Sequence, residues 1–282
     1  MARVPVFDNH VHLRPDGHHV EAAKAYEKAG GTHFMLVHSP HDDFVGDTPD
    51  WERAYDRTVA TAEAVRKETG VQCWVALGPY PVHLVRMAET LGVERGVQQL
   101  IKGAETAARY VEEGKAVAIG EVGRPHFEVS DEVWDASNVA LEEILGIARG
   151  AGCPAILHTE SADPEVMADL GAIADRAKMP RDRVIKHYAP PLVKPEECHG
   201  LFPSIIASRK HIRKAAADAP GGRWFLETDY IDDLSRPDVV MPVDTVPRRV
   251  SGFLQSGDLG EEMLWKSGVE WVERLYGVHP EL

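Results

Sequence analysis

Six side chains that could bind metal ions lie at or just after the ends of short apolar segments of this 282-residue sequence. They are four histidines and two carboxylates: His10, His12, Glu121, His158, His187 and Asp229. Imidazole nitrogens and carboxylate oxygens together suit zinc, manganese, iron or nickel, whereas calcium prefers oxygen ligands. Residues two apart in a strand point the same way, so the two histidines at 10 and 12 can bind one ion together.

Each of these residues also has a simpler structural interpretation. A single histidine after a strand is most often a loop or core residue, Glu121 could pair with Arg124, and Asp229 could cap a loop. However, a carboxylate or imidazolium that is buried without a partner is costly. Six such groups at one place need a common positive charge, which a pair of divalent cations supplies. We therefore expect two metal ions, with zinc favoured and manganese, cobalt, nickel, iron or magnesium as alternatives.

Short apolar segments alternate with amphipathic helical segments along the whole chain. The expected strands cover residues 4–8, 33–39, 72–78, 116–123, 154–160, 183–189, 201–208 and 223–230. These segments are continuous and rich in Val, Ile, Ala and Leu, which is typical of parallel strands buried on both faces. A repeat of about 35 residues predicts an α/β fold, a (β/α)8 TIM barrel, with its site at the C-terminal ends of the strands. No linker divides residues 1–282, so we expect one hydrolase domain.

Charge and composition limit the classes of partner. The net charge is −14, which disfavours extended nucleic-acid binding and favours a small-molecule or short nucleic-acid-like substrate. No apolar segment is long enough to span a membrane, so no membrane partner is expected. The three cysteines are far apart in the sequence and the N-terminus has no export signal, which predicts a cytoplasmic protein with reduced thiols.

The ordered set of donors resembles the metal site of the amidohydrolase superfamily of barrel enzymes. That superfamily has His-x-His at strand 1, histidines at strands 5 and 6, and Asp at strand 8. Glu121 lies in "GEVG", where many members carry a carboxylated lysine, and this resembles the TatD family of metal-dependent hydrolases. "LETD" at 226–229 and "VERLYGV" at 272–278 resemble that family's strand 8 signature and its closing helix.

The resemblance implies a binuclear layout. His10, His12 and Asp229 would bind one ion, His158 and His187 would bind the other, and Glu121 would bridge both. A bridging water would attack a phosphoryl or carbonyl centre, and Asp229 would take the proton of that water and pass it to the leaving group.

The loops that would face a substrate depart from the TatD pattern. Arg124, Pro125 and His126 follow "GEVG" where Leu-Asp is typical, and His83 is displaced from the usual position after strand 3. Arg14 lies two residues after His12, where the similar "HVHLR" start of dihydroorotases has an arginine that binds a carboxylate. The candidate substrate-binding residues are therefore Arg14, His38, His83, Arg124 and His126, although loop residues of these types are usually solvated.

Two classes of reaction remain open on the sequence alone. The first is metal-dependent hydrolysis of a phosphoester, including nuclease activity at DNA ends. The alternative is an amidohydrolase or lactonase that acts on a small cyclic amide or ester. A purely structural metal is disfavoured, because structural sites are normally closed by four ligands, whereas six ligands around two ions leave room for water.

Overall fold

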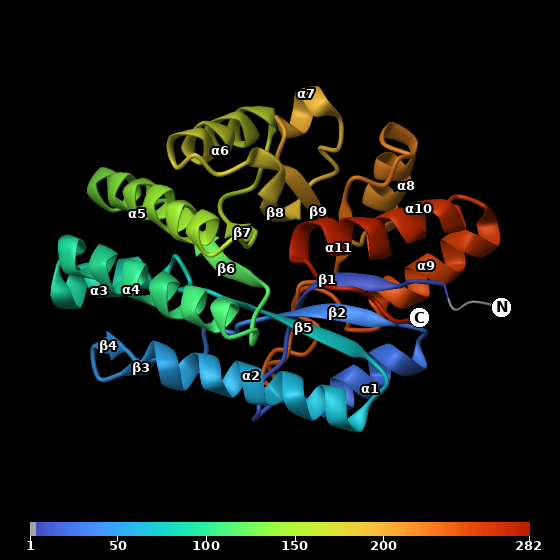
Figure 1. Ribbon diagram of the computed structural model, residues 1–282, viewed down its shortest axis with the longest axis horizontal. Helices are drawn as coiled ribbons and strands as arrows, with labels where there is room; N and C mark the ends of the chain where they lie inside the picture. The colour runs from blue at the N-terminus through green and yellow to red at the C-terminus, as the bar shows by residue number, and fades with distance from the viewer. Residues whose placement is uncertain (1–3) are drawn as a thin grey trace.

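Eight parallel strands follow one another around a curled sheet in the order in which they occur in the chain (Figure 1). The computed structural model describes residues 4–282, so residues 1–3 of the predicted domain lie outside the described residues. The strands are β1 (Phe7–His12), β2 (His33–Val37), β5 (Gln72–Leu77), β6 (Ala118–Gly123), β7 (Ala155–His158), β8 (Val184–Ala189), β9 (Phe202–Ile206) and β10 (Phe225–Glu227). A short ninth strand, β11 (Tyr230–Ile231), pairs with the free edge of β1. The predicted α/β barrel architecture is confirmed.

The sheet is curled far enough that β10, at one end of the strand order, returns to β1. β10 lies beside β1, and the backbone N–H and the hydroxyl of Thr228 both donate hydrogen bonds to the buried Asp8, at 3.1 and 2.8 Å. These bonds fix the chain just before Asp229 against the strand that carries His10 and His12. The closure therefore brings the two ends of the donor set together.

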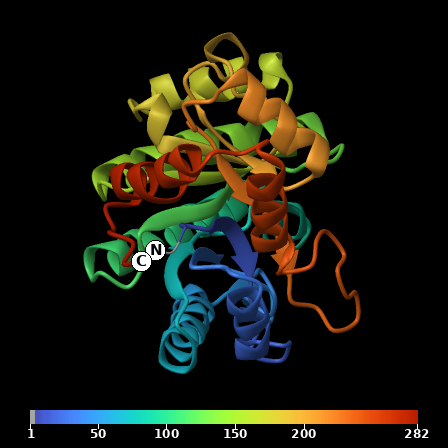
Figure 2. The same cartoon turned by 90° about the vertical axis from the view of Figure 1, so that its right-hand side faces the viewer.

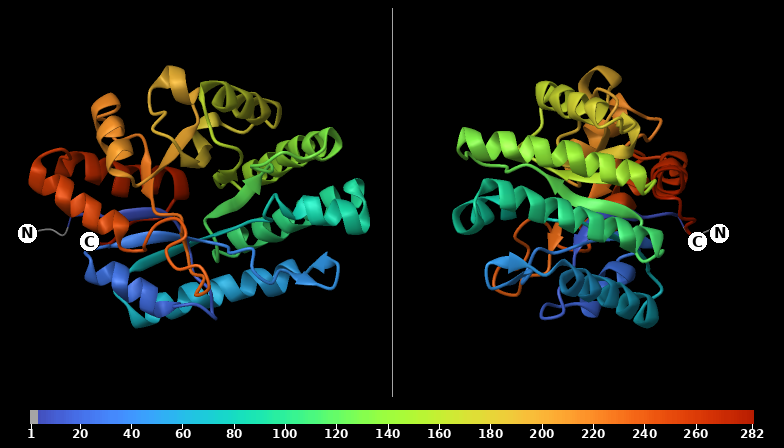
Figure 3. Two further views of the ribbon diagram at one scale, coloured as in Figure 1. Left: turned by 180° about the vertical axis from the view of Figure 1, so that it is seen from behind. Right: turned by 60° about the vertical axis from the view of Figure 1, so that its left-hand side comes forward.

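Helices cover the outside of the sheet. They are α1 (Val20–Lys28), α2 (Trp51–Glu68), α3 (His83–Leu91), α4 (Val93–Glu112), α5 (Asp131–Gly150), α6 (Pro164–Arg176), η1 (Arg181–Arg183), α7 (Pro195–Cys198) and α8 (Arg209–Asp218). The side chains of Asp50, Ser130, Asp163 and Ser208 cap the first turns of α2, α5, α6 and α8, which fixes where these helices begin. The long helices α4 and α5 pack side by side (Figure 3).

Strand side chains alternate between two apolar cores. On β2, Phe34 and Leu36 pack among the helices, whereas Met35 and Val37 point into the barrel. The barrel interior is filled by one apolar residue or more from each of the eight strands, and Val272, Leu275 and Tyr276 of the last helix, α11 (Trp271–Tyr276), pack against it. Apolar side chains therefore fill the interior. Polar groups are expected at the C-terminal ends of the strands.

Several segments differ from the expectation. β1 begins at Phe7 rather than residue 4, so His10 and His12 lie inside the strand. The loop after β2 contains a small hairpin, β3 (Phe44–Val45) and β4 (Thr48–Pro49). The final helix is divided into α10 (Glu261–Trp265), a π-helical turn η2 (Lys266–Glu270) and α11, and within that turn the Gly268 carbonyl lies 2.6 Å from His33 Nε2.

The segment after β11 contains a helix. This helix, α9 (Thr245–Ser256), contains Pro247 and Gly252, two residues that usually interrupt helices. Pro247 lies in the first turn, where its missing N–H has no partner to lose, and the apolar face of the helix is buried. The loop between β11 and α9 projects from the body of the protein, as the orange segment in Figure 2 shows. In residues 4–282, no helix is long and apolar enough to cross a membrane.

Candidate metal centre

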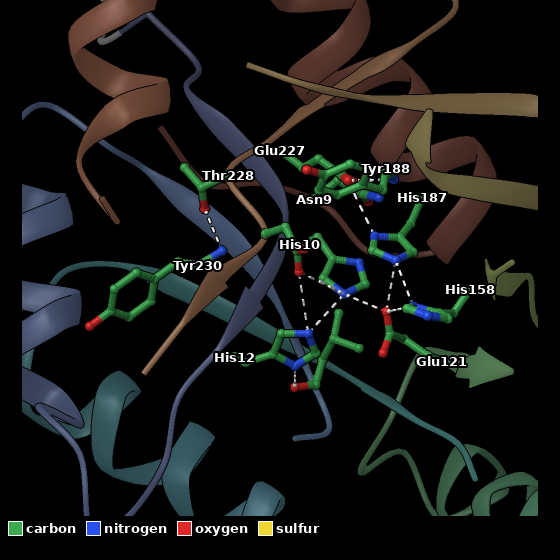
Figure 4. A network of polar contacts seen from close by, with 12 residues as sticks. Asn9, His10, His12, Glu121, His158, His187, Tyr188, Glu227, Thr228 and Tyr230 are labelled. Atoms are coloured by element: carbon green, nitrogen blue, oxygen red, sulfur yellow. Dashed lines mark hydrogen bonds and ion pairs between the residues drawn. The ribbon is translucent and has the colours of Figure 1, made fainter. Parts of the chain in front are cut away.

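Glu121, near the end of β6, faces three of the other predicted donors, His10, His158 and His187 (Figure 4). Its Oε1 atom is 2.9 Å from His187 Nε2, 3.2 Å from His158 Nδ1 and 3.2 Å from His10 Nε2. One carboxylate oxygen is therefore shared by histidines from three different strands. These neutral imidazoles cannot meet all of one another's hydrogen-bonding needs, because each ring has only one N–H to donate.

The remaining two predicted donors lie on the β1 side of Glu121. His12 Nε2 is 3.1 Å from His10 Nε2, and Asp229 Oδ1 is 3.6 Å from His12 Nε2 and 3.9 Å from His10 Nε2. The structure thus brings all six predicted donors together. Their atoms form three overlapping groups, each small enough to surround one ion: His10, His12 and Glu121; Glu121, His158 and His187; and His10, His187 and Asp229.

Hydrogen bonds on the outer side of two rings orient their inner nitrogens. His12 Nδ1 is 3.0 Å from the carbonyl oxygen of Val37, and His187 Nδ1 is 3.2 Å from the carboxylate of Glu227. A carbonyl and a carboxylate can only accept, so Nδ1 carries the proton in both rings. When these rings are neutral, as a metal ligand must be, Nε2 of His12 presents a lone pair to Asp229 and Nε2 of His187 presents one to Glu121. This arrangement is typical of metal-ligating histidines.

The donor set fits a divalent metal. At metal–nitrogen distances of about 2.0–2.1 Å, neighbouring ligands of a tetrahedral ion lie about 3.3 Å apart, close to the separations around Glu121. The buried Nδ1 of His10 has no hydrogen-bond partner among residues 4–282, so the polar contacts of this ring are those of Nε2, which faces the cluster. Lone pairs of nitrogen and oxygen that face one another at these distances need a cation between them.

The pKa shifts of the cluster residues also indicate that the site attracts positive charge. Burial alone would raise the pKa of Glu121, but His158 and His187 outweigh it and hold that pKa well below its usual range. Burial opposes a charge on His187, yet Glu121 and Glu227 raise its pKa to about 10. Burial would likewise raise the pKa of Asp229, but the hydrogen bond with His12 and the neighbouring histidines lower it. Both cluster carboxylates are therefore anionic at neutral pH and attract positive charge.

Glu227 contacts one of the predicted donors, His187, and the sequence interpretation did not single it out. It is fully buried, accepts a hydrogen bond from the backbone N–H of Tyr188 at 2.6 Å, and also contacts the Ser204 hydroxyl and His187 Nδ1. Its position in "LETD", two residues before Asp229, is the signal that could have found it. Tyr188 and Asp229 both have left-handed backbone conformations, at φ 51° and 48°, and such strain is typical of functional sites.

A cavity of about 530 Å³ opens above the cluster. Its lining includes His12, Arg14, Ser39, His41, Tyr80, Glu121, His126, His158, Asp229, Asp233 and Arg236. Two of the predicted substrate residues, Arg14 and His126, are therefore at the mouth. Arg236, in the loop after β11, joins them and was not predicted.

The two predicted residues at the mouth make different contacts. Arg14 forms an ion pair with Asp16 at 2.6 Å and lies 3.8 Å from Asp233, which also pairs with Arg236. His126 Nδ1 is 2.8 Å from Nε2 of His158, on the side of that ring that faces away from Glu121. Arg14 can therefore meet a substrate anion, whereas His126 contacts a proposed metal ligand directly.

Two predicted substrate residues, His38 and His83, lie away from the mouth. Both bind the buried carboxylate of Asp43, His38 Nε2 at 3.1 Å and His83 Nε2 at 3.0 Å, and His38 Nδ1 also contacts Thr58. With His38 and His83 beside it, the pKa of Asp43 is lowered despite burial. This network anchors the hairpin segment after β2, so the predicted substrate role is corrected to a structural one.

Arg124 is also corrected, because it does not line the cavity and its guanidinium pairs with carboxylates. It is only 3% exposed and pairs with Glu160 and Asp169, and it lies 4.5 Å above the Trp134 ring. It makes no ion pair with Glu121, which was the structural alternative. Arg124 holds the loop after β7 against α5 and α6.

Arg124→Met should therefore destabilise the protein without changing substrate affinity. Removing the guanidinium leaves Glu160 and Asp169 without their partner, and hydrogen bonds to charged groups contribute about 1.5–3 kcal/mol each. We expect the free energy of unfolding to fall by about 2–3 kcal/mol in urea denaturation. Arg176→Met, which breaks the exposed pair with Glu142, should change it by less than about 0.5 kcal/mol. A large rise in KM with unchanged stability would restore the substrate role of Arg124.

Comparison with known proteins decides the family. A family model described as "TatD related DNase" matches residues 7–277. The chain belongs to the TatD family. An uncharacterized protein of Methanocaldococcus jannaschii is 34% identical over 286 residues, covering 99% of this chain and 98% of that protein. TatD-family membership makes the chain a metal-dependent hydrolase, as the sequence resemblance implied.

Solved structures with the same fold include TatD homologues and phosphotriesterase-like proteins. A TatD homologue of Escherichia coli superimposes with a TM-score of 0.60 at 17% identity, over 97% of this chain and 98% of that chain. The phosphotriesterase homology protein of Escherichia coli gives 0.63 at 15% identity, over 98% and 100%. A mutant phosphotriesterase-like lactonase of Deinococcus radiodurans gives 0.62 at 17% identity, over 97% and 95%. At these identities the likeness establishes the fold that this TatD-family chain shares with them.

Proposed function

We propose that this TatD-family hydrolase cleaves phosphoesters at a site for two divalent cations. One observation carries the proposal: Oε1 of Glu121 lies within 3.2 Å of ligand nitrogens on both sides, His10 on one and His158 and His187 on the other. A carboxylate in that position suits a bridge between two ions. His10, His12 and Asp229 would hold the first ion, His158 and His187 the second, with zinc favoured by the nitrogen-rich set.

The residues of the chain have distinct tasks in this proposal. Two bound cations would lower the pKa of a water molecule and offset the charge that develops on the phosphoryl oxygens. Oδ1 of Asp229, beside His12 and open to the cavity, would accept the proton of the attacking water and return it to the leaving group. Glu227 keeps the proton on Nδ1 of His187 and so holds that ring in the ligating tautomer.

Two arginines at the mouth could contact an anionic substrate. Arg14 and Arg236 line the cavity from two loops and both approach the carboxylate of Asp233. A phosphoryl group that enters between them and the metal centre would find positive charge on two sides. The name of the family model and the phosphate held in the active site of the phosphotriesterase homology protein support the same substrate chemistry.

Metal removal combined with a substrate panel tests this proposal. Protein stripped with a chelator should lose activity, and zinc, manganese, cobalt or nickel should restore it, with two ions per chain by elemental analysis. The panel contains a nitrophenyl phosphodiester, a nitrophenyl phosphomonoester, a short oligonucleotide, a lactone and a cyclic amide. We expect turnover of the phosphoesters. Turnover of only the lactone or the amide would replace the proposal with the alternative activity, and full activity in metal-free protein would reject the mechanism.

A further inference from the structure

A second, smaller cavity lies beside the metal centre, at the ends of β7 and β8. It has a volume of about 310 Å³, and its lining includes three of the proposed metal ligands, His158, His187 and Asp229. Thr159, Glu160, Ser161, Lys186 and Tyr188 also line it. We call this cavity the lysine cleft. A group bound in the lysine cleft could belong to the same small molecule as a group bound at the metal centre, because the two sites share these ligands.

Lys186 lies on the face of β8 that is turned away from the metal cluster. Side chains alternate along this strand, so that Val184 packs among the helices, Ile185 packs in the barrel interior and His187 faces Glu121. The residue that pairs with Lys186 on β7 is Leu157, which is apolar and fully buried. Packing alone therefore does not require a lysine at this position.

The ammonium group of Lys186 is buried and only partly paired. The residue is 1% exposed, and Nζ donates one hydrogen bond, of 2.6 Å, to the carbonyl oxygen of His187. An ammonium has three N–H groups, so two of them have no protein acceptor in the part of the chain that the structure describes. The carboxylate of Glu160, the nearest lining acid, pairs with Arg124 instead. A buried charge with so few partners is costly, and an anion beside it would lower that cost.

A small monoanion suits the lysine cleft better than a second phosphate does. One ammonium supplies a single positive charge, and the carboxylate of Glu160 also lines the cleft. A phosphate monoester carries nearly two negative charges at neutral pH and would be repelled by that carboxylate. A carboxylate carries one charge, and its two oxygens can accept from the free N–H groups of Lys186 and from the hydroxyls of Thr159 and Ser161. The volume is at the lower limit for small-molecule sites, so the group must be small.

We propose that Lys186 binds a carboxylate of a small substrate whose scissile phosphoester lies at the metal centre. This inference rests on the proposed phosphoesterase function and narrows it to phosphoesters that also carry a carboxylate. Lys186 does not line the larger cavity of Arg14 and Arg236, so these arginines and Lys186 meet different parts of the substrate. A substrate without the carboxylate would leave the buried ammonium unpaired, which is how a site of this kind discriminates.

Phenyl phosphate and the ortho, meta and para carboxyphenyl phosphates test this proposal in the metal-loaded enzyme, with phosphate release as the assay. We expect the native enzyme to prefer at least one carboxyphenyl phosphate by about tenfold or more in kcat/KM. In Lys186→Met this preference should fall to within about twofold of unity, chiefly through KM, because uniform binding is lost. Loss of metal or of folding would slow both kinds of substrate and leave the preference unchanged, so the ratio isolates the role of Lys186.

Binding of the uncleavable analogues, benzylphosphonate and its carboxylated counterparts, provides a readout that does not depend on turnover. In calorimetry, Lys186→Met should abolish the preference for the carboxylated compound. Lys102→Met, which makes the same change at an exposed lysine of α4, is the matched control and should retain it.

Three results would each overturn the proposal: no preference for any carboxylated compound in the native enzyme, a preference that survives in Lys186→Met, or an equal loss in Lys102→Met. Stronger binding of a phenylene bisphosphate than of every carboxyphenyl compound would also overturn it, because the cleft would then accept a phosphate. If the carboxylated phosphonate binds in a Lys186-dependent way but no phosphoester is cleaved, the lysine cleft stands and the proposed function fails.

Discussion

Glu121→Gln should lower kcat/KM for a phosphodiester by at least about 10³-fold and reduce the metal content below two ions per chain. The variant keeps the shape of the side chain but removes the negative charge that three histidines share within 3.2 Å. Metal ions supply several kcal/mol of transition-state stabilisation, and each 1.36 kcal/mol corresponds to a tenfold change in rate. Loss of the bridge would therefore have the largest effect of any single substitution proposed for this protein.

Glu142→Gln is the control for that variant, because it makes the same chemical change in an exposed ion pair with Arg176 on the outer surface. It should retain activity and metal. Circular dichroism of both proteins separates a failure to fold from a loss of metal. If Glu121→Gln kept two ions and native turnover, Glu121 could not be the bridging ligand, and the binuclear proposal would fail with it.

Asp229→Asn should lower kcat by about 10² to 10⁴-fold, which is the usual contribution of a general base. Asparagine keeps one oxygen donor but cannot accept the proton at Oδ1. Asparagine also tolerates the left-handed conformation of this position, φ 48°, so the backbone should not rearrange. The ion held by His158, His187 and Glu121 should remain, because none of these residues depends on Asp229 for its position.

Metal content and kcat must be measured together on each Asp229 variant. His10→Ala should differ from Asp229→Asn, because it should reduce occupancy of the first ion as well as the rate. Asp182→Asn, an exposed partner of Arg274, is the matched surface control and should behave as the native enzyme does. Near-native kcat with both ions bound in Asp229→Asn would exclude it as the base, and His126 would become the best remaining proton acceptor at the mouth.

The sequence by itself determined the fold class and the set of candidate metal donors. Continuous apolar segments every 35 residues or so are compatible with few architectures other than a parallel barrel. In that architecture the strand ends converge, and so His10, Glu121 and Asp229 could be placed together without coordinates. The positions of these donors at strand ends were informative for two reasons. Side chains alternate along a strand, and parallel strands all end at the same side of the sheet, so the location of a residue at a strand end is nearly fixed.

The tertiary structure decided what the loops do. His38 and Arg124 follow strands as the metal donors do, yet Asp43 binds the first, and Glu160 and Asp169 bind the second. Asp43 follows His38 by five residues in the same loop, whereas Glu160 and Asp169 come from other segments than Arg124. No local pattern predicts such pairings, because a loop can turn its side chains toward the cavity or away from it. The helices α8 and α9 come together in the same way, since their apolar faces share one core with residues of β9 and β10.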